Sequence, residues 1–219
     1  MLSPLIIVGA GGLGSQLVER VISDPANKDH WIFAGLYDDR ADKSQTIVNW
    51  SAALGYPMQH FSAREEIPFS QEPKFVMAIG DPAQKKIYAK KVLDWGGQFV
   101  SLLHVDNERS VTSKVGRSIL FKNCVVGPNV EIGDFVWIDR NCIVGHDCVI
   151  GNFCHIGVNV CIGGATEVGD NTVIHSGSMI SNGIKIGSHC EIGLGSVILR
   201  DVADGSIMLG NPARKIGNV

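Results

Sequence analysis

The chain has 219 residues, with 19 lysines and arginines against 22 aspartates and glutamates, so its formal net charge is −3. This balance excludes a basic face for nucleic acid or for an anionic membrane. No apolar run approaches the ~20 residues that span a bilayer, and residues 1–8 lack the charged region and cleavage site of a signal peptide. We therefore expect a cytoplasmic protein.

Residues 1–104 alternate between strand and helix patterns. The apolar run 5–8 predicts a buried parallel strand, and a helix is expected to follow it through Ser23. Further strands are expected at 31–37, 75–79 and 98–102, with a helix over 83–95. This βαβ order indicates a small Rossmann-like domain over residues 1–104.

The loop after the first strand formally matches the dinucleotide pattern G-x-G-x-x-G, in Gly9-Ala10-Gly11-Gly12-Leu13-Gly14. An acidic pair, Asp38-Asp39, follows the second strand. A helix N-terminus after such a loop favours a phosphate. About 100 residues hold only one mononucleotide-binding half, so a nucleotide diphosphate fits better than NAD. A tight turn with no ligand is the remaining alternative.

From Val126 onward, every sixth residue is valine or isoleucine, at thirteen consecutive positions. These positions are Val126, Ile132, Ile138, Val144, Ile150, Ile156, Ile162, Val168, Ile174, Ile180, Ile186, Ile192 and Ile198. A six-residue period predicts a parallel β-helix of hexapeptides, with three hexads in each coil of eighteen residues. We expect this β-helix over residues 105–205 and a cap over 206–219. Glycine follows most of the aliphatic residues, where we expect it to supply positive φ.

Small or β-branched residues stand two places before each aliphatic position, where they should also point inward. Five of the six cysteines occupy this slot. Cys142, Cys148 and Cys154 fall at equivalent places of one coil, so a three-thiol metal site is conceivable. Cysteine as a small buried residue is the better interpretation, because nothing matches zinc-ligand spacing. We expect no metal.

Residues eighteen apart should stack on the same corner of adjacent coils, which places His146 beneath Gly164, then Asn182 and Arg200. Gly163 and Gly164 should leave a depression beside His146 with uncovered amides, a suitable seat for a thioester carbonyl. Histidine has an ordinary pKa of about 6.5, which suits a general base. Asp147 is expected to orient the imidazole, unless another chain supplies that partner. The alternative is that His146 is an exposed turn residue.

These features together resemble the hexapeptide-repeat sugar O/N-acyltransferase family, which includes sialic acid O-acetyltransferases and nucleotide-amino-sugar N-acetyltransferases. The resemblance is carried by the glycine loop, Tyr37-Asp38-Asp39-Arg40, Ala78-Ile79-Gly80-Asp81, Gly145-His146-Asp147, Phe153-Cys154-His155-Ile156, Gly163-Gly164 and Gly210-Asn211-Pro212-Ala213-Arg214. It implies a left-handed β-helix, and a homotrimer that carries acetyl-CoA between subunits.

The resemblance also implies site residues. Those for the nucleotide sugar are Gly9, Gly11, Gly12, Leu13, Asp38, Asp39, Arg40, Gly80 and Asp81. Those for the acetyl donor are His155, Gly163, Gly164, Asn182, Arg214 and Lys215. His155 could contact either the donor or the sugar. Arg214 and Lys215 could instead belong to a polar C-terminal cap. A carboxylate at Asp38 can accept from uracil, thymine or guanine, so UDP, dTDP and GDP stay open, with UDP favoured by the resemblance.

The leading hypothesis is an acetyl-CoA-dependent N-acetyltransferase for a nucleotide-linked amino sugar of the UDP-4-amino-sugar type, in bacterial surface glycan biosynthesis. His146 would act as general base in a direct transfer, because the candidate cysteines point inward. The alternatives are O-acetylation of a sialic-type sugar and a non-catalytic trimer that binds nucleotide sugars. A metal-dependent hydratase is disfavoured, because the nine-residue gap from His146 to His155 does not supply a three-histidine site.

Overall fold

The computed structural model describes residues 2–23 and 31–219. They form two compact units, one of residues up to 80 with 84–100, and one of residues 81–83 with 101–219. None of the helices described has the length and apolar character needed to cross a bilayer. The domain boundaries after residues 104 and 205 stay predictions.

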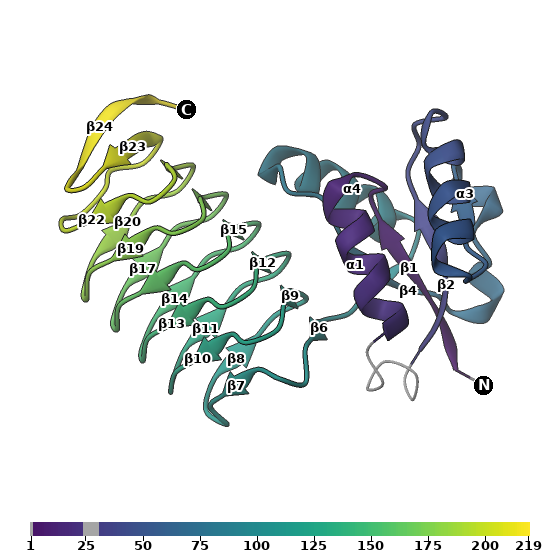
Figure 1. The fold of residues 1–219 in the computed structure, drawn as a ribbon, viewed down its shortest axis with the longest axis horizontal. Coiled ribbons are helices and arrows are strands. Elements are labelled where there is room, and N and C mark those ends of the chain that lie inside the picture. Colours follow the sequence, from purple (N-terminus) through teal and green to yellow (C-terminus); the bar gives the residue numbers. More distant parts are fainter. Residues whose placement is uncertain (1, 24–30) are drawn as a thin grey trace. The chain divides into compact units, whose positions relative to one another are not determined.

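The first unit contains a five-stranded parallel sheet in the order β3-β2-β1-β4-β5 (Figure 1). Its strands are β1 Ser3–Val8, β2 Trp31–Tyr37, β3 Gln59–Phe61, β4 Lys74–Met77 and β5 Gln98–Phe99. Its helices are α1 Gly12–Ser23, α3 Lys43–Leu54 and α4 Pro82–Asp94, with 3-10 turns at Arg64–Glu66 and Phe69–Gln71. The order reverses between β1 and β4, which is where open α/β sheets bind ligands at the carboxyl ends of their strands.

Two neighbouring residues at the end of β2 contact helical segments on opposite faces of this sheet. Leu36 and Tyr37 point to opposite faces because side chains alternate along a strand. A Cβ on Gly14 in α1 would contact Leu36 at 3.6 Å, whereas the Tyr37 ring meets the edge of Trp95, just after α4, at 5.2 Å between centroids. The sheet therefore has helices on both sides.

Two elements of this unit, α3 and β3, have no counterpart in the sequence prediction. Only Ile47 of α3 is buried, so the helix lacks the apolar stripe that reveals amphipathic helices. The expected strand 98–102 ends at Phe99, and Leu102–Leu103 instead form β6, which pairs with β9 in the second unit. The other predicted elements differ by a few residues at their ends.

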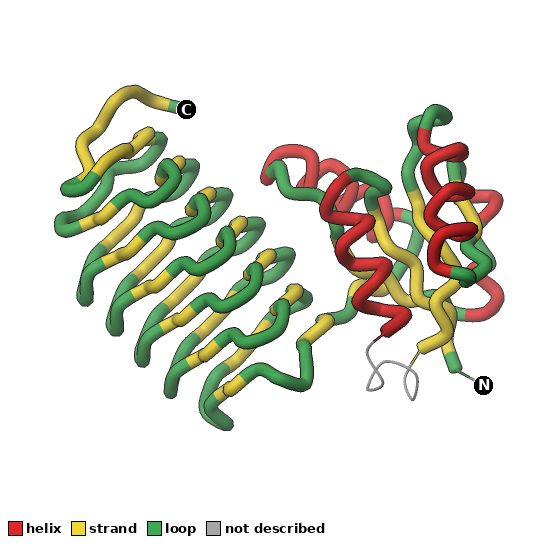
Figure 2. The backbone as a smooth tube through the Cα atoms, viewed as in Figure 1, coloured by secondary structure: helices red, strands yellow, loops and turns green. Residues whose placement is uncertain are grey.

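The second unit is a left-handed parallel β-helix with three faces (Figures 1 and 2). Face 1 comprises β7 Glu108–Arg109, β10 Val125–Val126, β13 Ile143–Val144, β16 Cys161–Ile162, β19 Met179–Ile180 and β22 Val197–Ile198. Face 2 comprises β8 Lys114–Val115, β11 Glu131–Ile132, β14 Val149–Ile150, β17 Glu167–Val168 and β20 Lys185–Ile186. Face 3 comprises β6 Leu102–Leu103, β9 Ile119–Leu120, β12 Trp137–Ile138, β15 His155–Ile156, β18 Val173–Ile174, β21 Glu191–Ile192, β23 Ser206–Gly210 and β24 Ala213–Asn218.

The coils stack in the eighteen-residue register that the sequence predicts. Ile143 pairs with Cys161, and Val149 pairs with Glu167, one coil further on. All thirteen aliphatic positions of the hexads are buried and form one continuous core. At the C-terminal end, β23 pairs in parallel with β21, and β24 folds back antiparallel on β23.

The glycines after the aliphatic residues have a different role from the expected one. Positive φ falls two residues later, at positions such as Asn129 and Asp147, both at 58°. Asparagine and aspartate tolerate this left-handed conformation. Gly133 is needed for close stacking, because its Cβ would lie 2.7 Å from the Asn152 side chain of the next coil. The prediction that these glycines supply positive φ is therefore wrong.

Candidate functional site

His146 lies on the corner that joins face 1 to face 2, which we call the His146 corner: residues 127–130, 145–148, 163–166, 181–184 and 199–202. Its side chain is 65% exposed, so it points away from the core. A Cβ on Gly164 would lie 2.6 Å from Nε2 of His146, so the imidazole rests directly over the glycine. Gly164 is consequently buried. The imidazole itself lies where the depression was expected.

Asp147 holds the imidazole from its other nitrogen. Oδ2 of Asp147 lies 2.7 Å from Nδ1 of His146, which leaves Nε2 directed toward Gly164. Nδ2 of Asn129, one coil earlier, donates to Oδ1 of Asp147 at 3.0 Å. Hydrogen bonds from Asn129 and then His146 lower the pKa of Asp147, so the carboxylate is ionised at neutral pH. The structure thus supplies partners for Asp147 within the same chain.

The His146 corner continues toward the C-terminus through Gly164 and Asn182 to Arg200. These residues are three coils apart from end to end, or about 14 Å at ~4.8 Å per coil. A cavity of about 470 Å³ lies at the far end, and Arg200, Arg214 and Lys215 line it. The His146 corner therefore leads from the imidazole to a cavity that is lined by three basic residues and by Asp201.

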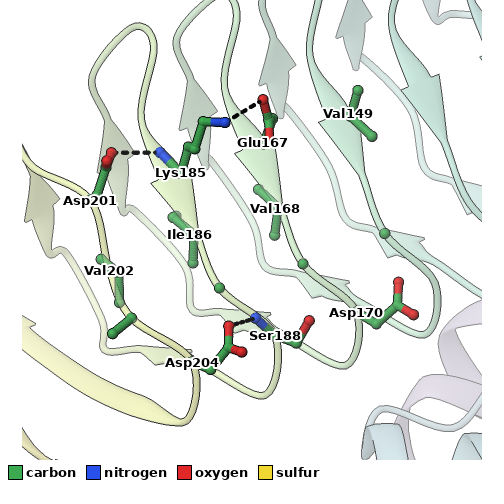
Figure 3. Close-up of a pocket in the computed structure, with 14 residues that line it drawn as sticks. Val149, Glu167, Val168, Asp170, Lys185, Ile186, Ser188, Asp201, Val202 and Asp204 are labelled. Carbon is green, nitrogen blue, oxygen red and sulfur yellow. Dashed lines mark hydrogen bonds and ion pairs between the residues drawn. The ribbon is translucent and has the colours of Figure 1, made fainter.

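A larger cavity of about 820 Å³ lies over face 2 (Figure 3). Two of its carboxylates accept hydrogen bonds from backbone amides of the β-helix. Asp201 accepts from the Lys185 N–H and Asp204 from the Ser188 N–H, both at 2.8 Å. Lys185 also forms an ion pair with Glu167 at 3.2 Å. With this excess of carboxylates, the cavity is less suited to a phosphate than the cationic one.

In the first unit, the glycine loop, the acidic pair and Gly80 follow the carboxyl ends of β1, β2 and β4. These strands are neighbours in a parallel sheet, so their ends lie at one edge. A Cβ on Gly11 or Gly12 would meet nothing within 4 Å, whereas one on Gly9 would lie 2.9 Å from Ile79. The open glycines, at the start of α1, leave backbone amides approachable by an anion.

Asp38 ties the loops of this edge together. Its carboxylate accepts from the Ala10 N–H at 2.8 Å and from Arg40 Nε and Nη2 at 2.8 and 2.7 Å. The side chain is only 2% exposed. Burial alone would raise the pKa of Asp38, but the hydrogen bonds from Arg40 and Ala10 hold it below its ordinary value. Asp38 is therefore an ionised link between the glycine loop and Arg40.

Asp39 belongs to a cluster with residues of α4 that the sequence did not indicate. It accepts from the Tyr88 hydroxyl and from Lys91 Nζ, the latter at 2.7 Å. The Lys91 ammonium lies 5.6 Å from the Tyr88 ring centroid and 5.9 Å from those of Tyr37 and Trp95. Burial raises the pKa of Asp39, but Lys91 and Tyr88 together lower it below its ordinary value. The cluster combines an anion, a cation and ring surfaces.

The remaining predicted residues are dispersed. His155 lies on β15 of face 3, half-buried, with its ring stacked on Trp137 at 6.2 Å between centroids, so one chain does not bring it to the His146 corner. Leu13 is half-buried in α1, and Asp81 is exposed before α4. No group of three potential metal ligands occurs in residues 2–23 and 31–219. Asn129 and Arg200 were not predicted as site residues, although the eighteen-residue register links them to Asp147 and His146.

Comparison with known families agrees with this architecture. Residues 129–164 and 165–200 match the bacterial transferase hexapeptide family (six repeats), and residues 4–92 match the PglD N-terminal domain. A comparison with curated proteins gives no significant match.

Three solved structures are similar over almost their full length. PerB from Caulobacter crescentus, in complex with CoA and GDP-perosamine, is 25% identical with a TM-score of 0.85, covering 99% of both chains. The acetyltransferase domain of PglB from Neisseria gonorrhoeae FA1090, in complex with acetyl coenzyme A, is 25% identical with a TM-score of 0.84, covering 99% of this chain and 100% of that one. A histidine variant of perosamine N-acetyltransferase from Caulobacter crescentus, at 24% identity and a TM-score of 0.86 over 100% and 99% of the chains, shares the fold.

The two matched domains occur in the same order as the two units of the structure, and the similar structures extend over both. The chain thus combines a PglD N-terminal domain with bacterial transferase hexapeptide repeats, as the resemblance to the hexapeptide-repeat sugar O/N-acyltransferase family implied, and it is an enzyme of the acyltransferase class.

Proposed function

We propose that the protein is an acetyl-CoA-dependent N-acetyltransferase that acts on the amino group of a nucleotide-linked amino sugar. The observation that carries the proposal is the imidazole of His146, oriented by Asp147 through Nδ1 and seated with Nε2 over Gly164. PerB has been solved with CoA and GDP-perosamine, and the PglB domain with acetyl coenzyme A. These complexes support a thioester donor and an amino-sugar acceptor for this chain.

In the proposed reaction, the acceptor amine attacks the carbonyl carbon of the acetyl thioester. His146 Nε2 takes the proton that the nitrogen loses, and Asp147 stabilises the resulting imidazolium. The Gly164 N–H donates to the carbonyl oxygen as negative charge develops there. The C–S bond then breaks, and the proton passes from the imidazolium to the sulfur of CoA. We propose that the transfer is direct, because the cysteines in the inward slots of the hexads, including Cys148 beside His146, are buried.

We propose that the donor lies along the His146 corner, with its thioester at Gly163 and Gly164 and its pantetheine arm passing Asn182. Its phosphates would meet Arg200, Arg214 and Lys215, because a cluster of three cations favours phosphate oxygens. Whether His155 contacts donor or acceptor depends on a neighbouring subunit, since it lies on a different face of this chain.

The acceptor's nucleotide is assigned to the first unit. The amides at Gly11 and Gly12 and the start of α1 suit its diphosphate. Asp39 and Arg40, with Gly80 and Asp81, would contact base and sugar, while Asp38 holds Arg40 and the glycine loop in place. The sequence resemblance favours UDP, and the GDP-perosamine of the PerB complex makes GDP the first alternative.

A homotrimer is supported by the outer surface of face 1. Its outward residues form an apolar column of Val125, Ile143, Cys161, Met179 and Val197, with Ile143 46% and Met179 57% exposed. The corresponding column of face 2 is mostly charged and carries the Lys114–Glu131 ion pair at 2.7 Å. We propose that neighbouring protomers cover face 1, which borders the His146 corner. All six cysteines are free thiols, which suits a reducing compartment such as the cytoplasm. A role in bacterial surface glycan biosynthesis stays a prediction.

The proposal is tested by assaying acetyl transfer from acetyl-CoA to UDP-, dTDP- and GDP-linked amino sugars, beside matched hydroxyl acceptors. We expect acetylation of an amine, and a loss of about 10²–10⁴-fold in turnover for His146→Ala with CoA binding retained. His175→Ala is the control, because His175 pairs with Glu191 on face 3. Full activity of His146→Ala would contradict the mechanism, and transfer only to hydroxyls would replace it by O-acetylation.

A further inference from the structure

Buried cysteines of the β-helix act as hydrogen-bond donors to the backbone. The thiols of Cys142, Cys148 and Cys154 lie 3.0, 3.1 and 3.2 Å from the carbonyl oxygens of Gly157, Gly163 and Gly169, each fifteen residues further along the chain. Thr166 and Thr172 donate to the same kind of carbonyl through their hydroxyls. The inward slot therefore holds a donor as well as a small side chain.

One of these bonds is made next to the candidate catalytic group. Cys148 is fully buried and its thiol donates to the carbonyl of Gly163. That carbonyl belongs to the same peptide unit as the N–H of Gly164. Because the trans peptide is planar, its N–H points away from its C=O. Holding the Gly163 carbonyl toward the core therefore directs the Gly164 N–H away from the core, at the corner where His146 lies one coil earlier.

The Gly164 N–H differs from amides at the equivalent place on the next corner. There, the Asn152 N–H donates to Asp170 at 2.7 Å and the Ser188 N–H donates to Asp204 at 2.8 Å. Within the described residues, no hydrogen bond forms at the Gly164 N–H. The side chain one coil above is Asn182. Its Oδ1 lies close to Gly163, as the oxygens of Asp170 and Asp204 lie close to Gly151 and Gly187, but it accepts no hydrogen bond from the Gly164 N–H. Gly164 is buried beneath the imidazole, but its N–H has no hydrogen-bond partner among the described residues, so it can donate to the oxygen of an incoming thioester.

We propose that Cys148 is a positioning residue for acyl transfer: its thiol fixes the Gly163–Gly164 peptide so that the Gly164 N–H meets the thioester carbonyl oxygen. The inference rests on the proposed function. Burial raises the pKa of the Cys148 thiol, so it stays protonated and remains a donor across the working pH range. Cys148 does not touch the substrate and forms no covalent bond to it.

The matched control is Cys154. Its thiol makes the same bond to Gly169 one corner further on, away from His146, and it is equally buried. Cys148→Ala and Cys154→Ala therefore remove the same donor from the same slot and should lower the unfolding temperature by similar amounts. Cys148→Ser restores a donor of the kind that Ser178 provides to Gly193 at 3.0 Å.

The experiment compares the full-length wild type with these three variants in steady-state kinetics with acetyl-CoA, using the amino sugar on which the wild type is most active. We expect kcat of Cys148→Ala to fall about 10-fold or more, short of the ~10²–10³-fold loss on deleting an oxyanion donor outright. The KM for acetyl-CoA should change less than kcat. Cys148→Ser should recover most of kcat, and Cys154→Ala should keep wild-type kcat.

A binding measurement gives a second readout. In the proposed complex the Gly164 N–H contacts only the acetyl carbonyl. Calorimetry should therefore show that Cys148→Ala lowers the affinity for acetyl-CoA more than the affinity for CoA. Cys154→Ala should leave the ratio of the two affinities unchanged. Equal kcat and equal affinity ratios in the two alanine variants would overturn the inference while the proposed function stands. A wild type that binds no CoA and transfers no acetyl group would overturn the proposed function and the inference with it.

Discussion

Gly164 has no side chain where the imidazole of His146 lies, and a Cβ there would come within 2.6 Å of Nε2. The two residues are one coil apart on the same corner, so the ring of one coil covers the backbone of the next. The imidazole is fixed on its other side by Asp147 at 2.7 Å. Nε2 therefore has a defined position with respect to the Gly164 amide.

Gly164→Ala should displace the imidazole and lower kcat by about 10²-fold, because a shift of about 1 Å in a catalytic group has an effect of this size. Gly157→Ala is the matched control: its Cβ would lie 2.7 Å from the Ser176 backbone nitrogen on another corner, so it disturbs coil stacking equally. Both variants should lose thermal stability, which differential scanning calorimetry measures. Equal kcat values for the two variants would contradict this account of Gly164.

Asn129→Gly should lower kcat several-fold, since it removes the amide that holds Asp147 while glycine tolerates the φ of 58°. The pKa of Asp147 should rise toward its ordinary value, so the activity lost should grow at acidic pH. Asn123→Gly removes an equivalent coil-to-coil bond, to Asn141 at 3.2 Å, and serves as control. A pH–rate profile of both variants checks this, and superimposable profiles would remove Asn129 from the site.

Arg200→Gln should raise the Kd for CoA about 10-fold, the equivalent of ~1.4 kcal/mol, as expected for one charged hydrogen bond. The effect should shrink for dephospho-CoA if Arg200 meets the 3′-phosphate. Arg117→Gln is the control, because Arg117 pairs with Asp134 at another corner. Calorimetric titration measures both, and an unchanged Kd in Arg200→Gln would show that the donor's phosphates lie elsewhere.

Asp38 should make the first unit sensitive to acid. Its pKa is lowered in the folded state, so its contribution to stability is complete above the unfolded value of about 4 and is lost as pH falls through the folded value. Asp38→Asn should lower the free energy of unfolding by about 1–3 kcal/mol at pH 7, with a smaller difference at pH 3. Urea unfolding followed by tryptophan fluorescence measures it, since Trp31, Trp50 and Trp95 belong to this unit.

Asp94→Asn is the control for Asp38, since Asp94 forms an exposed ion pair with Lys90. Such pairs contribute little to stability. A difference between wild type and Asp38→Asn that is the same at pH 3 and pH 7 would contradict the role of the ionised carboxylate.

The eighteen-residue register explains why the contact of His146 with Gly164 was predictable. In a β-helix, sequence separation translates directly into position, so the stacking of two corner residues needs no tertiary information. The same register would have indicated Asn129 beneath Asp147. The role of the glycines after the aliphatic residues was predicted wrongly. They are needed because the next coil packs closely against them, and a prediction from local φ preferences does not include this contact.

The first unit was less predictable. The helix α3 lacks a buried stripe. The Asp38 carboxylate binds Ala10, 28 residues earlier on another loop, and Arg40, two residues later on its own loop. Such hydrogen bonds depend on the conformations of the loops that follow the strands, and the hydrophobic pattern of the sequence does not predict those conformations. The cluster of Asp39 with Tyr88 and Lys91 likewise joins residues about 50 positions apart. The roles of these residues toward a nucleotide stay predictions.

Each coil of the β-helix adds the same rise along its axis. The distance from the His146 imidazole to the three basic residues of the cavity can therefore change only by whole coils. Duplicating or deleting eighteen residues between Gly164 and Arg200 would leave both ends chemically intact and alter only their separation, by about 4.8 Å. If the donor lies along the His146 corner as proposed, the number of coils between Gly164 and Arg200 sets the length of the thioester carrier that fits.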